Sequence, residues 1–510
     1  MVNVTKRMRI EKLLIANRGE IAVRVMRTAR ELGIRTVAVY SEADKHALHV
    51  ELADEAILIG PPPASESYLR MDRIIEAAKS AGAQAIHPGY GFLSENPEFS
   101  QAVTDAGLIF VGPPAKAMRL LGNKIESRVL AQSIGVPVTP GATFSTPDAK
   151  SVAPEAAKIG YPVLIKAAAG GGGKGMRVVH KPEDLGLALE GAAREAKSAF
   201  GDATVYLEKY LTRPRHIEFQ IFRDTHGNAV HLGERECSIQ RRHQKIIEES
   251  PSVAITPELR AKMGTAAVKL VNAAGYENAG TVEMLLDGAT FYFLEVNARL
   301  QVEHPVTEWV TGEDLVEWQL RIASGERLPR SQAEISARGH AIECRIYAED
   351  PANNFLPSSG RILALEEPHI PGVRIDSGIR TGSDVSVYYD PILSKIIARA
   401  DDREHAIEKM QSALDNYVLL GVATPVELLR DVLNHPEFRK GNLSTHFLDD
   451  HLPNWKPQPP SSDLLACALY AAMHAPAGGT TASANGAKAG VPSPWQSLGQ
   501  WQIADARVDR

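Results

Sequence analysis

The 510-residue sequence has only three cysteines and no long run of apolar residues. Cys237, Cys344 and Cys467 lie far apart and form no C-x-x-C pair, which excludes a disulfide framework and a structural zinc site. No stretch of about 18 apolar residues exists, and the N-terminus lacks the apolar core of a signal peptide, so we expect neither membrane spanning nor secretion. These absences predict a protein of a reducing compartment, the cytoplasm.

The chain also lacks a strong charge of either sign. Its formal net charge is -6, and lysine and arginine are scattered, so we expect no nucleic-acid partner. Hydrophobic residues make up 44% of the sequence, enough for a chain of this length to bury several cores. The length predicts about three or four domains.

The N-terminal part alternates short apolar runs with helical patterns. Predicted strands cover 12–16, 36–39, 56–59, 83–86 and 108–111, with helices near 71–81 and 95–106 among the connections. This alternation predicts a doubly wound parallel sheet. The first strand-to-helix turn, from Ala16 to Glu20, has no G-x-G-x-x-G pattern, which argues against a dinucleotide site.

A glycine-rich segment follows, in which five of the six residues from Gly170 to Gly175 are glycine. Glycines let backbone amides approach phosphates closely, and Lys166 and Lys174 add positive charge. Lys174 is not followed by the serine or threonine of a Walker motif, and the extended segment 176–179 comes next. We therefore predict a hairpin lid over phosphates, with an ordinary flexible loop as the alternative.

The stretch 281–296 predicts a second hairpin that brings carboxylates together. A three-residue loop centred on Ala289 would set Glu283 opposite Glu295. Like charges in directly opposite positions repel, and a divalent cation removes the conflict. The oxygen ligands of Glu283, Glu295 and Asn297 suit Mg²⁺ better than zinc. The alternative is that one carboxylate points outward or pairs with a lysine.

Two further polar segments flank this hairpin in the sequence. Arg299, Gln301 and Glu303 follow it, and the basic run 240–245 precedes it. A lone basic run is usually a solvated face. The nearby crowd of carboxylates makes an anion site the better interpretation, because such crowding is costly unless a metal and an anionic substrate neutralise it.

Five motifs, in this order, resemble the biotin carboxylase family of ATP-grasp enzymes over about residues 10 to 450. They are the segments 15–22, 87–96, 170–175, 240–245 and 301–305. The resemblance implies an α/β protein with an N-terminal doubly wound parallel domain, an ATP-grasp lid and a C-terminal α+β catalytic domain. It also implies ATP- and bicarbonate-dependent carboxylation of biotin, the first half-reaction of an acyl-CoA carboxylase, with Mg²⁺ or Mn²⁺ as the metal.

The same resemblance, with composition, divides the chain. The expected parts are 1–122 (N-terminal domain), 123–138 (connector), 139–211 (lid), 212–450 (catalytic domain) and 451–510 (linker and the start of a truncated further module). Proline-, glycine- and alanine-rich stretches after residue 450 predict linkers around one short helix near 463–474. The ending around Trp495 and Trp501 resembles the biotin-containing subunits of 3-methylcrotonyl-CoA and geranyl-CoA carboxylases.

The resemblance implies roles for individual residues. The nucleotide would be bound by Lys124, Lys166, Gly171, Gly172, Gly173, Lys174, Gly175, Glu208, Lys209, Leu211, His216, Gln240, His243 and Leu285. The metal would be bound by Glu283, Glu295 and Asn297, and bicarbonate by Lys245, Arg299, Gln301 and Val302. Biotin would be contacted by Tyr90 and Arg345. The catalytic set would be Glu303, Arg299, Arg345 and Lys245.

By the same resemblance, Glu303 is the general base that deprotonates bicarbonate before it attacks ATP. The resulting carboxyphosphate breaks down to CO₂ and phosphate, and the phosphate takes the N1′ proton of biotin. Arg345 stabilises the enolate-like ureido oxygen.

Simpler interpretations remain for single residues. His216 could be a core or surface histidine, and Arg345 could pair with Glu343 or Glu349. Cys237 and Cys344 could be buried thiols without a catalytic role.

No Ala-Met-Lys-Met motif occurs, so we expect no biotin attached to this chain. The expected partners are a biotin carrier domain, on another polypeptide or in a removed C-terminal portion, and the carboxyltransferase of the same enzyme. Helix residues Arg24, Arg27 and Glu31 match a region that the family often uses in dimers, and the sequence leaves the oligomeric state open. The alternatives are another ATP-grasp ligase that forms an acyl or carbamoyl phosphate, and a nucleotide-binding regulatory module without chemistry. The sequence leaves the acyl-CoA open.

Overall fold

The computed structural model describes residues 9–144, 148–167, 176–201, 203–242 and 244–474. The chain divides into two units, Met1–Pro457 and Gln458–Arg510. The described part of the second unit contains α16, Ser462–His474, which confirms the helix predicted near 463–474. Among the helices of the described residues, none is long and apolar enough to cross a membrane.

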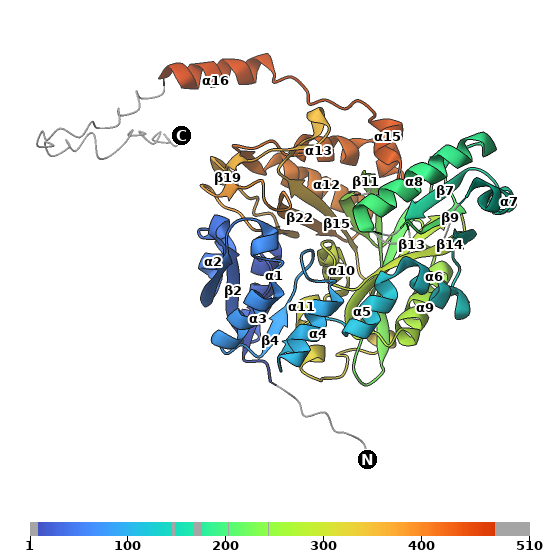
Figure 1. Cartoon of the computed structure of the whole chain (residues 1–510). Helices are drawn as coiled ribbons and strands as arrows, with labels where there is room; N and C mark the ends of the chain where they lie inside the picture. Colours follow the sequence, from blue (N-terminus) through green and yellow to red (C-terminus); the bar gives the residue numbers. More distant parts are fainter. Residues whose placement is uncertain (1–8, 145–147, 168–175, 202, 243, 475–510) are drawn as a thin grey trace, which may run out of the picture. The chain divides into compact units, whose positions relative to one another are not determined.

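The first sheet is parallel throughout, with the order β3-β2-β1-β4-β5 (Figure 1, blue). Its strands are β1 Lys12–Ile15, β2 Arg35–Ser41, β3 Glu55–Gly60, β4 Ala85–His87 and β5 Ile109–Phe110. The helices that connect them are α1 Gly19–Glu31, α2 Leu48–Leu52, α3 Met71–Ser80 and α4 Pro97–Asp105. This confirms the predicted doubly wound sheet.

Helices cover both faces of the central strand β1, which explains its unbroken apolar run. Leu14 packs in one cluster with Ile74 of α3 and Phe99 of α4. Leu13 faces the other way and packs in a cluster with Val25 of α1. All of these side chains are fully buried.

A separate antiparallel sheet occupies 141–209, in the order β6-β9-β7-β8. Its strands are β6 Gly141–Phe144, β7 Val163–Ala167, β8 Arg177–Val179 and β9 Val205–Lys209, and α7 Ala149–Ile159 and α8 Leu185–Phe200 pack against it. β7 and β8 pair on either side of the glycine-rich segment, as the hairpin interpretation predicts. Residues 168–175 themselves lie outside the described residues.

The largest sheet has eight antiparallel strands in the order β14-β13-β10-β11-β12-β15-β22-β20. They are β10 Arg215–Arg223, β11 Ala229–Arg241, β12 Gln244–Ser250, β13 Asn278–Asp287, β14 Thr290–Asn297, β15 His340–Tyr347, β20 Val373–Ser377 and β22 Ile392–Ala400. Its principal helices are α9 Pro257–Ala273, α10 His304–Thr311, α11 Leu315–Ala323, α12 Arg403–Asp415 and α13 Val426–Asn434.

The remaining helices and strand pairs complete the first unit. The helices are α5 Ala115–Gly122, α6 Lys124–Ser133, α14 Pro436–Arg439 and α15 Phe447–His451. The two-stranded pairs are β16 Glu349–Asp350 with β17 Leu356–Pro357, β18 Gly360–Arg361 with β21 Asp384–Val385, and β19 Ala364–Glu366 with β23 Val418–Leu420.

Helices α10 and α12 lie on opposite faces of the large sheet at β15. Ile342 of β15 is in the cluster that contains the buried residues of α12, whereas Ala341 packs with Val306 and Val310 of α10. Because successive strand residues point to opposite faces, Glu343 and Arg345 share the α10 side with Ala341. That side carries the charged residues of the site.

The hairpin of β13 and β14 differs from the prediction in its turn. Asp287 pairs with Thr290, so the connection has two residues and the predicted three-residue loop is wrong. Gly288 takes φ +60° in this tight turn. A register shift just after Glu283 acts as a β-bulge and sets Glu283 opposite Glu295, as predicted.

Candidate active site

The centre of the candidate site is the ammonium group of Lys245, on β12. Its Nζ lies 2.5 Å from Glu218 Oε2, 2.8 Å from Glu283 Oε1 and 2.7 Å from Glu303 Oε1. Burial alone would lower the pKa of Lys245, but these three carboxylates raise it well above its ordinary value. Lys245 is therefore a fixed cation that holds three acidic side chains together.

Glu303 precedes α10 and is fully buried. Its Oε1 contacts Lys245, its Oε2 lies 3.0 Å from Arg345 Nη2, and Cys237 Sγ is 3.9 Å from Oε1. Burial would raise the pKa of Glu303, but Lys245 and Arg345 hold it well below its usual range. The side chain is therefore ionised at neutral pH.

Arg299 is positioned by its neighbours on the loop after β14 and by one distant carboxylate. Its Nε donates to Glu95 Oε2 at 2.9 Å, Nη1 donates to Gln301 Oε1 at 2.7 Å, and Nη2 donates to Asn297 Oδ1 at 3.1 Å. The carbonyl of Val302 accepts from Lys395 Nζ at 2.7 Å. Gln301 and Lys245 both contact Glu283, so the structure brings the loop of Arg299, Gln301 and Val302 close to Lys245.

The predicted metal ligands lie side by side at the end of the β13–β14 hairpin. Glu283 Oε1 accepts from Asn297 Nδ2 at 2.8 Å and from Gln301 Nε2 at 3.2 Å. The Glu295 side chain is 36% exposed, and its nearest cation is Lys124 Nζ at 3.7 Å. The set consists of two carboxylates and an amide, and the Glu295 carboxylate is open to solvent. Such oxygen ligands fit Mg²⁺.

Another group of ligand atoms, from His216, Glu218 and Glu283, lies within 4.8 Å of one another. The ammonium of Lys245 contacts both carboxylates of this set but only one, Glu283, of the set with Glu295, so a cation in the buried set would meet the stronger repulsion. His216 Nε2 lies 3.1 Å from Glu283 Oε2. We therefore favour the open set with Glu295 over this buried set.

The predicted nucleotide residues on β7 and β9 form an ion pair. Lys166 contacts Glu208, whose Oε2 also accepts from Thr139 Oγ1 at 2.9 Å. Burial opposes the charge of Lys166, but Glu208 raises its pKa. The ammonium of Lys209 instead donates to the carbonyls of Gly160 and Tyr161, at 2.8 and 3.2 Å.

The other predicted nucleotide residues, apart from Lys124 on α6, lie on the large sheet, in the loop after β9 or outside the described residues. His216 is opposite Leu285 in the β10–β13 register, and its Nδ1 lies 3.1 Å from Gln240 Nε2. Leu211 is half-buried in the loop after β9. The residues that lie outside the described part of the chain are Gly171, Gly172, Gly173, Lys174, Gly175 and His243.

The two predicted biotin residues lie on different elements. Tyr90 donates its hydroxyl to Glu20, and burial raises the pKa of Glu20 to about 7. Arg345 donates through Nε to Glu248 Oε1 at 2.6 Å. Glu349 pairs with Arg241 instead, so the simpler interpretation of an Arg345–Glu349 pair is wrong.

Four charged residues of the site were not predicted from the sequence: Glu218, Glu248, Glu95 and Arg235. Arg235 is 0% exposed and donates to Glu218 Oε1 at 2.5 Å, as well as to side chains of Gln220, Thr281 and Thr307. It fixes the carboxylate that faces Lys245. For Glu218 the sequence did contain a signal, since polar residues alternate at 216, 218 and 220 and therefore share one face of a strand.

The three thiols differ in accessibility. Cys237 and Cys344 are buried, burial raises the pKa of each well above its ordinary value, and Cys467 on α16 is exposed. We expect a thiol reagent at pH 8 to modify one cysteine per folded chain and three after denaturation, because only thiolates react. Alkylation of Cys467 alone should leave the ATP-dependent activity of the chain within about twofold. Rapid modification of a second thiol, with loss of activity, would contradict this assignment.

The arginines expected at a dimer surface are engaged within the chain. The Arg24 guanidinium is buried and lies 2.6 Å from Glu308 and 3.0 Å from Asp314. Arg27 pairs with Asp376 at 2.9 Å but keeps an exposed side chain. Arg24 is therefore unavailable to a second copy.

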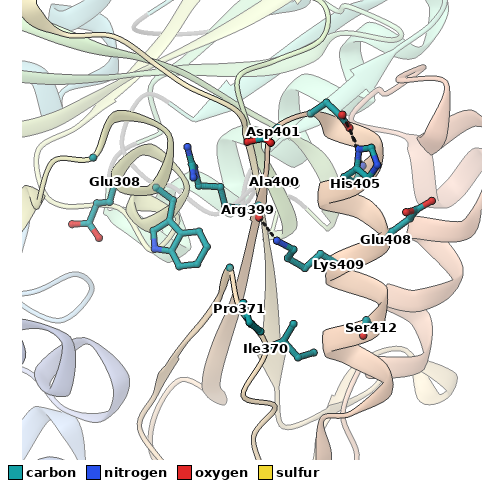
Figure 2. A pocket seen from close by; sticks show the side chains of 14 residues that line it. Glu308, Ile370, Pro371, Arg399, Ala400, Asp401, His405, Glu408, Lys409 and Ser412 are labelled. Carbon is teal, nitrogen blue, oxygen red and sulfur yellow. Dashed lines mark hydrogen bonds and ion pairs between the residues drawn. The ribbon is translucent and has the colours of Figure 1, made fainter.

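A pocket of about 1060 Å³ lies apart from the predicted site residues (Figure 2). In it, Lys409 Nζ donates to the Arg399 carbonyl at 2.9 Å. Its lining residues are Glu308, Trp309, Gly312, Ile370, Pro371, Gly372, Arg399, Ala400, Asp401, Asp402, His405, Glu408, Lys409 and Ser412.

The parallel N-terminal sheet, the four-stranded sheet around a glycine-rich connection and the antiparallel sheet with its carboxylate centre together define an ATP-grasp ligase. Three family descriptions match successive parts of the chain. They are "Biotin carboxylase, N-terminal domain" at 9–118, "Carbamoyl-phosphate synthase L chain, ATP binding domain" at 123–331 and "Biotin carboxylase C-terminal domain" at 343–450.

Known proteins resemble the chain over most of its length. A pyruvate carboxylase subunit of Methanothermobacter thermautotrophicus is 54% identical over 86% of this chain and 90% of its own. The mitochondrial methylcrotonoyl-CoA carboxylase alpha subunit of Mus musculus is 53% identical over 87% of this chain, which spans 62% of that relative's length. The chain belongs to the biotin carboxylase family and is an ATP-grasp enzyme of that family.

A solved structure agrees with this membership. The biotin carboxylase domain dimer of Hydrogenobacter thermophilus 2-oxoglutarate carboxylase, in complex with MgADP, ADP and bicarbonate, is 45% identical. The match has a TM-score of 0.85 and covers 89% of this chain and 100% of that one.

Proposed function

We propose that the chain carboxylates biotin with ATP and bicarbonate, as the first half-reaction of an acyl-CoA carboxylase. The observation that carries the proposal is a connected network of side chains. Glu303 contacts Lys245 and Arg345 directly. Arg299 is linked to Lys245 through Gln301 and Glu283. Cations and a carboxylate base at one place suit the binding and deprotonation of a small anion.

In the proposed mechanism, Arg299, Lys245, Gln301 and the backbone of Val302 hold bicarbonate. Glu303 removes its proton, and a bicarbonate oxygen then bonds to the γ-phosphorus of ATP as the bond to ADP breaks. Carboxyphosphate breaks down to CO₂ and phosphate, which takes the N1′ proton of biotin so that N1′ can attack CO₂. Arg345 stabilises negative charge on the ureido oxygen, and Tyr90 contacts the biotin.

Glu283, Glu295 and Asn297 would hold Mg²⁺ or Mn²⁺, which neutralises charge on the phosphates when bound. Lys124, Lys166, His216, Gln240 and the 208–211 segment would hold the nucleotide, with Lys209 contributing through its backbone. The glycine-rich segment, His243 and Leu285 complete the proposed nucleotide set.

The biotin would be carried by a carrier domain outside residues 1–510, and a carboxyltransferase subunit would use the carboxybiotin. The whole enzyme's acyl-CoA substrate would be that of the carboxyltransferase, as in a methylcrotonyl-CoA or geranyl-CoA carboxylase. A homodimer and a reducing, cytoplasmic compartment are part of the proposal, the latter because all three cysteines are free thiols.

Transfer of labelled bicarbonate to a separate biotinylated carrier domain tests the proposal. We expect acid-labile label on the carrier only when ATP, Mg²⁺ and biotin are all present. A matched carrier without biotin is the control. Absence of label on the biotinylated carrier, with an intact folded enzyme, would contradict the proposal.

A second candidate is an ATP-grasp ligase that forms carbamoyl phosphate, because the description matched at 123–331 is named for such an enzyme. Ammonia, in place of biotin, would then stimulate ADP formation in the presence of bicarbonate. The biotin carboxylase descriptions matched on both sides favour the first candidate.

A further inference from the structure

The proposed mechanism gives no role to Glu248, although this residue makes the shortest polar contacts of Arg345. Glu248 Oε1 accepts from Arg345 Nε at 2.6 Å and also contacts Nη2. On the other sides of the guanidinium, Nη1 donates to Tyr347 at 3.2 Å and Nη2 meets Glu303 at 3.0 Å. Glu248 therefore holds the edge of the guanidinium formed by Nε and Nη2, and Nη2 is shared with Glu303.

A second carboxyl group stands directly opposite Glu248. Glu343 on β15 is its partner in the β12–β15 register, and both residues are 0% exposed. Among the described residues, neither oxygen of Glu343 nor Oε2 of Glu248 has a hydrogen-bond partner. Cβ atoms of such a pair lie about 5 Å apart. Two ionised carboxylates there would repel, whereas one proton gives these oxygens a donor and an acceptor.

The surrounding charges do not neutralise both carboxylates. The titratable and charged groups that interact electrostatically with the pair are Arg345 and Cys344 on β15, Lys245 on β12, Lys395 on β22, Cys237 on β11 and Glu303 before α10, with Cys344 on the opposite face of the sheet. Lys245 is already shared by three other carboxylates. Lys395 Nζ lies 3.4 Å from Glu20 and 4.0 Å from Asp376. Among the described residues, Arg345 is thus the cation in direct contact with the pair, through Glu248, and Glu303 shares it.

The direction of the pKa shifts agrees with this charge count. Burial raises the pKa of Glu248 to about 7, against the opposing effect of Arg345. Burial raises the pKa of Glu343 well above its ordinary value, against the weaker effect of Lys395. Glu343 is therefore the member of the pair that keeps its proton at neutral pH.

We propose that Glu343 is a neutral acid that shares its proton with Glu248, and that ionised Glu248 is a positioning residue that orients Arg345. The inference rests on the proposed biotin carboxylation and assigns two further residues to it. The orienting contact between Glu248 and Arg345 depends on pH because it requires ionised Glu248. Glu248 is ionised above its pKa, so the orienting contact is present there and is lost as pH falls through about 7.

The kinetic test is the pH profile of kcat/KM for free biotin in four variants. In the parent, kcat/KM for biotin should fall as pH drops through about 7, and we call this fall the acid limb. We expect Glu248→Gln to lower kcat/KM for biotin about tenfold or more and to abolish the acid limb. The KM for ATP should stay within about threefold of the parent. Glu343→Gln keeps a neutral donor and should keep the acid limb. Glu343→Met offers Glu248 no donor and should move the limb upward by about one pH unit. The matched control, Glu234→Gln, removes a buried carboxylate that pairs with Arg260 instead, and should not move the limb.

An infrared measurement tests the proton directly and needs neither activity nor the Met variant. At neutral pH the protonated carboxyl C=O absorption of the parent should lose a component in Glu343→Gln and stay unchanged in Glu234→Gln. A band unchanged by Glu343→Gln would overturn the shared proton. Glu248→Gln within twofold of the parent at every pH would overturn the positioning role. If the parent itself made no carboxybiotin, the proposed function would fail, while the infrared result would still decide the proton.

Discussion

Replacing Glu303 by Gln is expected to lower bicarbonate-dependent ATP cleavage and biotin carboxylation together, by a factor on the order of 10² or more. Gln keeps the shape of the side chain but cannot accept the bicarbonate proton. Glu303 has no predicted contact with the nucleotide, so Mg-ATP affinity should stay within a few-fold of the parent. Initial rates of ADP and carboxybiotin formation, with nucleotide binding measured separately, check the prediction.

The structure adds a control for this variant. Glu303 also neutralises Lys245 and Arg345, and its loss could act through charge alone. Glu218→Gln removes a different carboxylate from the same ammonium and serves as the matched comparison. Near-normal bicarbonate-dependent turnover in Glu303→Gln would demote Glu303 to a structural partner of the two cations.

Replacing Glu295 by Gln should abolish most ATP-dependent activity and leave the unliganded protein as stable as before or slightly more stable. The Glu295 side chain is 36% exposed and meets Lys124 at 3.7 Å, a pair whose loss costs about 1 kcal/mol or less. Its removal also relieves repulsion with Glu283 across the hairpin. A Mg²⁺ titration of activity should show apparent metal affinity reduced on the order of 10²-fold.

The matched variant, Glu283→Gln, should separate metal binding from folding. Glu283 is buried and contacts Lys245, His216 and Asn297, so its loss should lower the free energy of unfolding on the order of 3 kcal/mol. Thermal unfolding of both variants without ligand checks the contrast. A large destabilisation by Glu295→Gln would show that Glu295 has a structural role that its exposure does not suggest.

Much of the fold could be predicted because local patterns agree with it. β1 is a central parallel strand covered on both faces, so its apolar run has no polar interruption. The loop of the β13–β14 hairpin was predicted with one residue too many, because the β-bulge at Glu283 has no signature in the residue types. Its consequence, Glu283 opposite Glu295, was predicted all the same.

The candidate site was predictable where its residues follow one another and unpredictable where distant strands meet. Arg299, Gln301 and Glu303 lie within five consecutive residues, and their convergence follows from that spacing. Glu248 reaches Arg345 only through the pairing of β12 with β15. Glu95 reaches Arg299 across about two hundred residues of sequence. Such contacts depend on strand order, which residue spacing does not specify.

Whether the chain carboxylates biotin is decided most simply by measuring ADP formation with bicarbonate and free biotin varied independently. We predict that biotin stimulates ADP formation only when bicarbonate and Mg²⁺ are present, and that carboxybiotin forms in proportion to ADP. Lys245, Glu303 and Arg345 would then act on bicarbonate and biotin as proposed. ADP formation that is indifferent to biotin and bicarbonate, or that responds to ammonia instead, would contradict the proposed function.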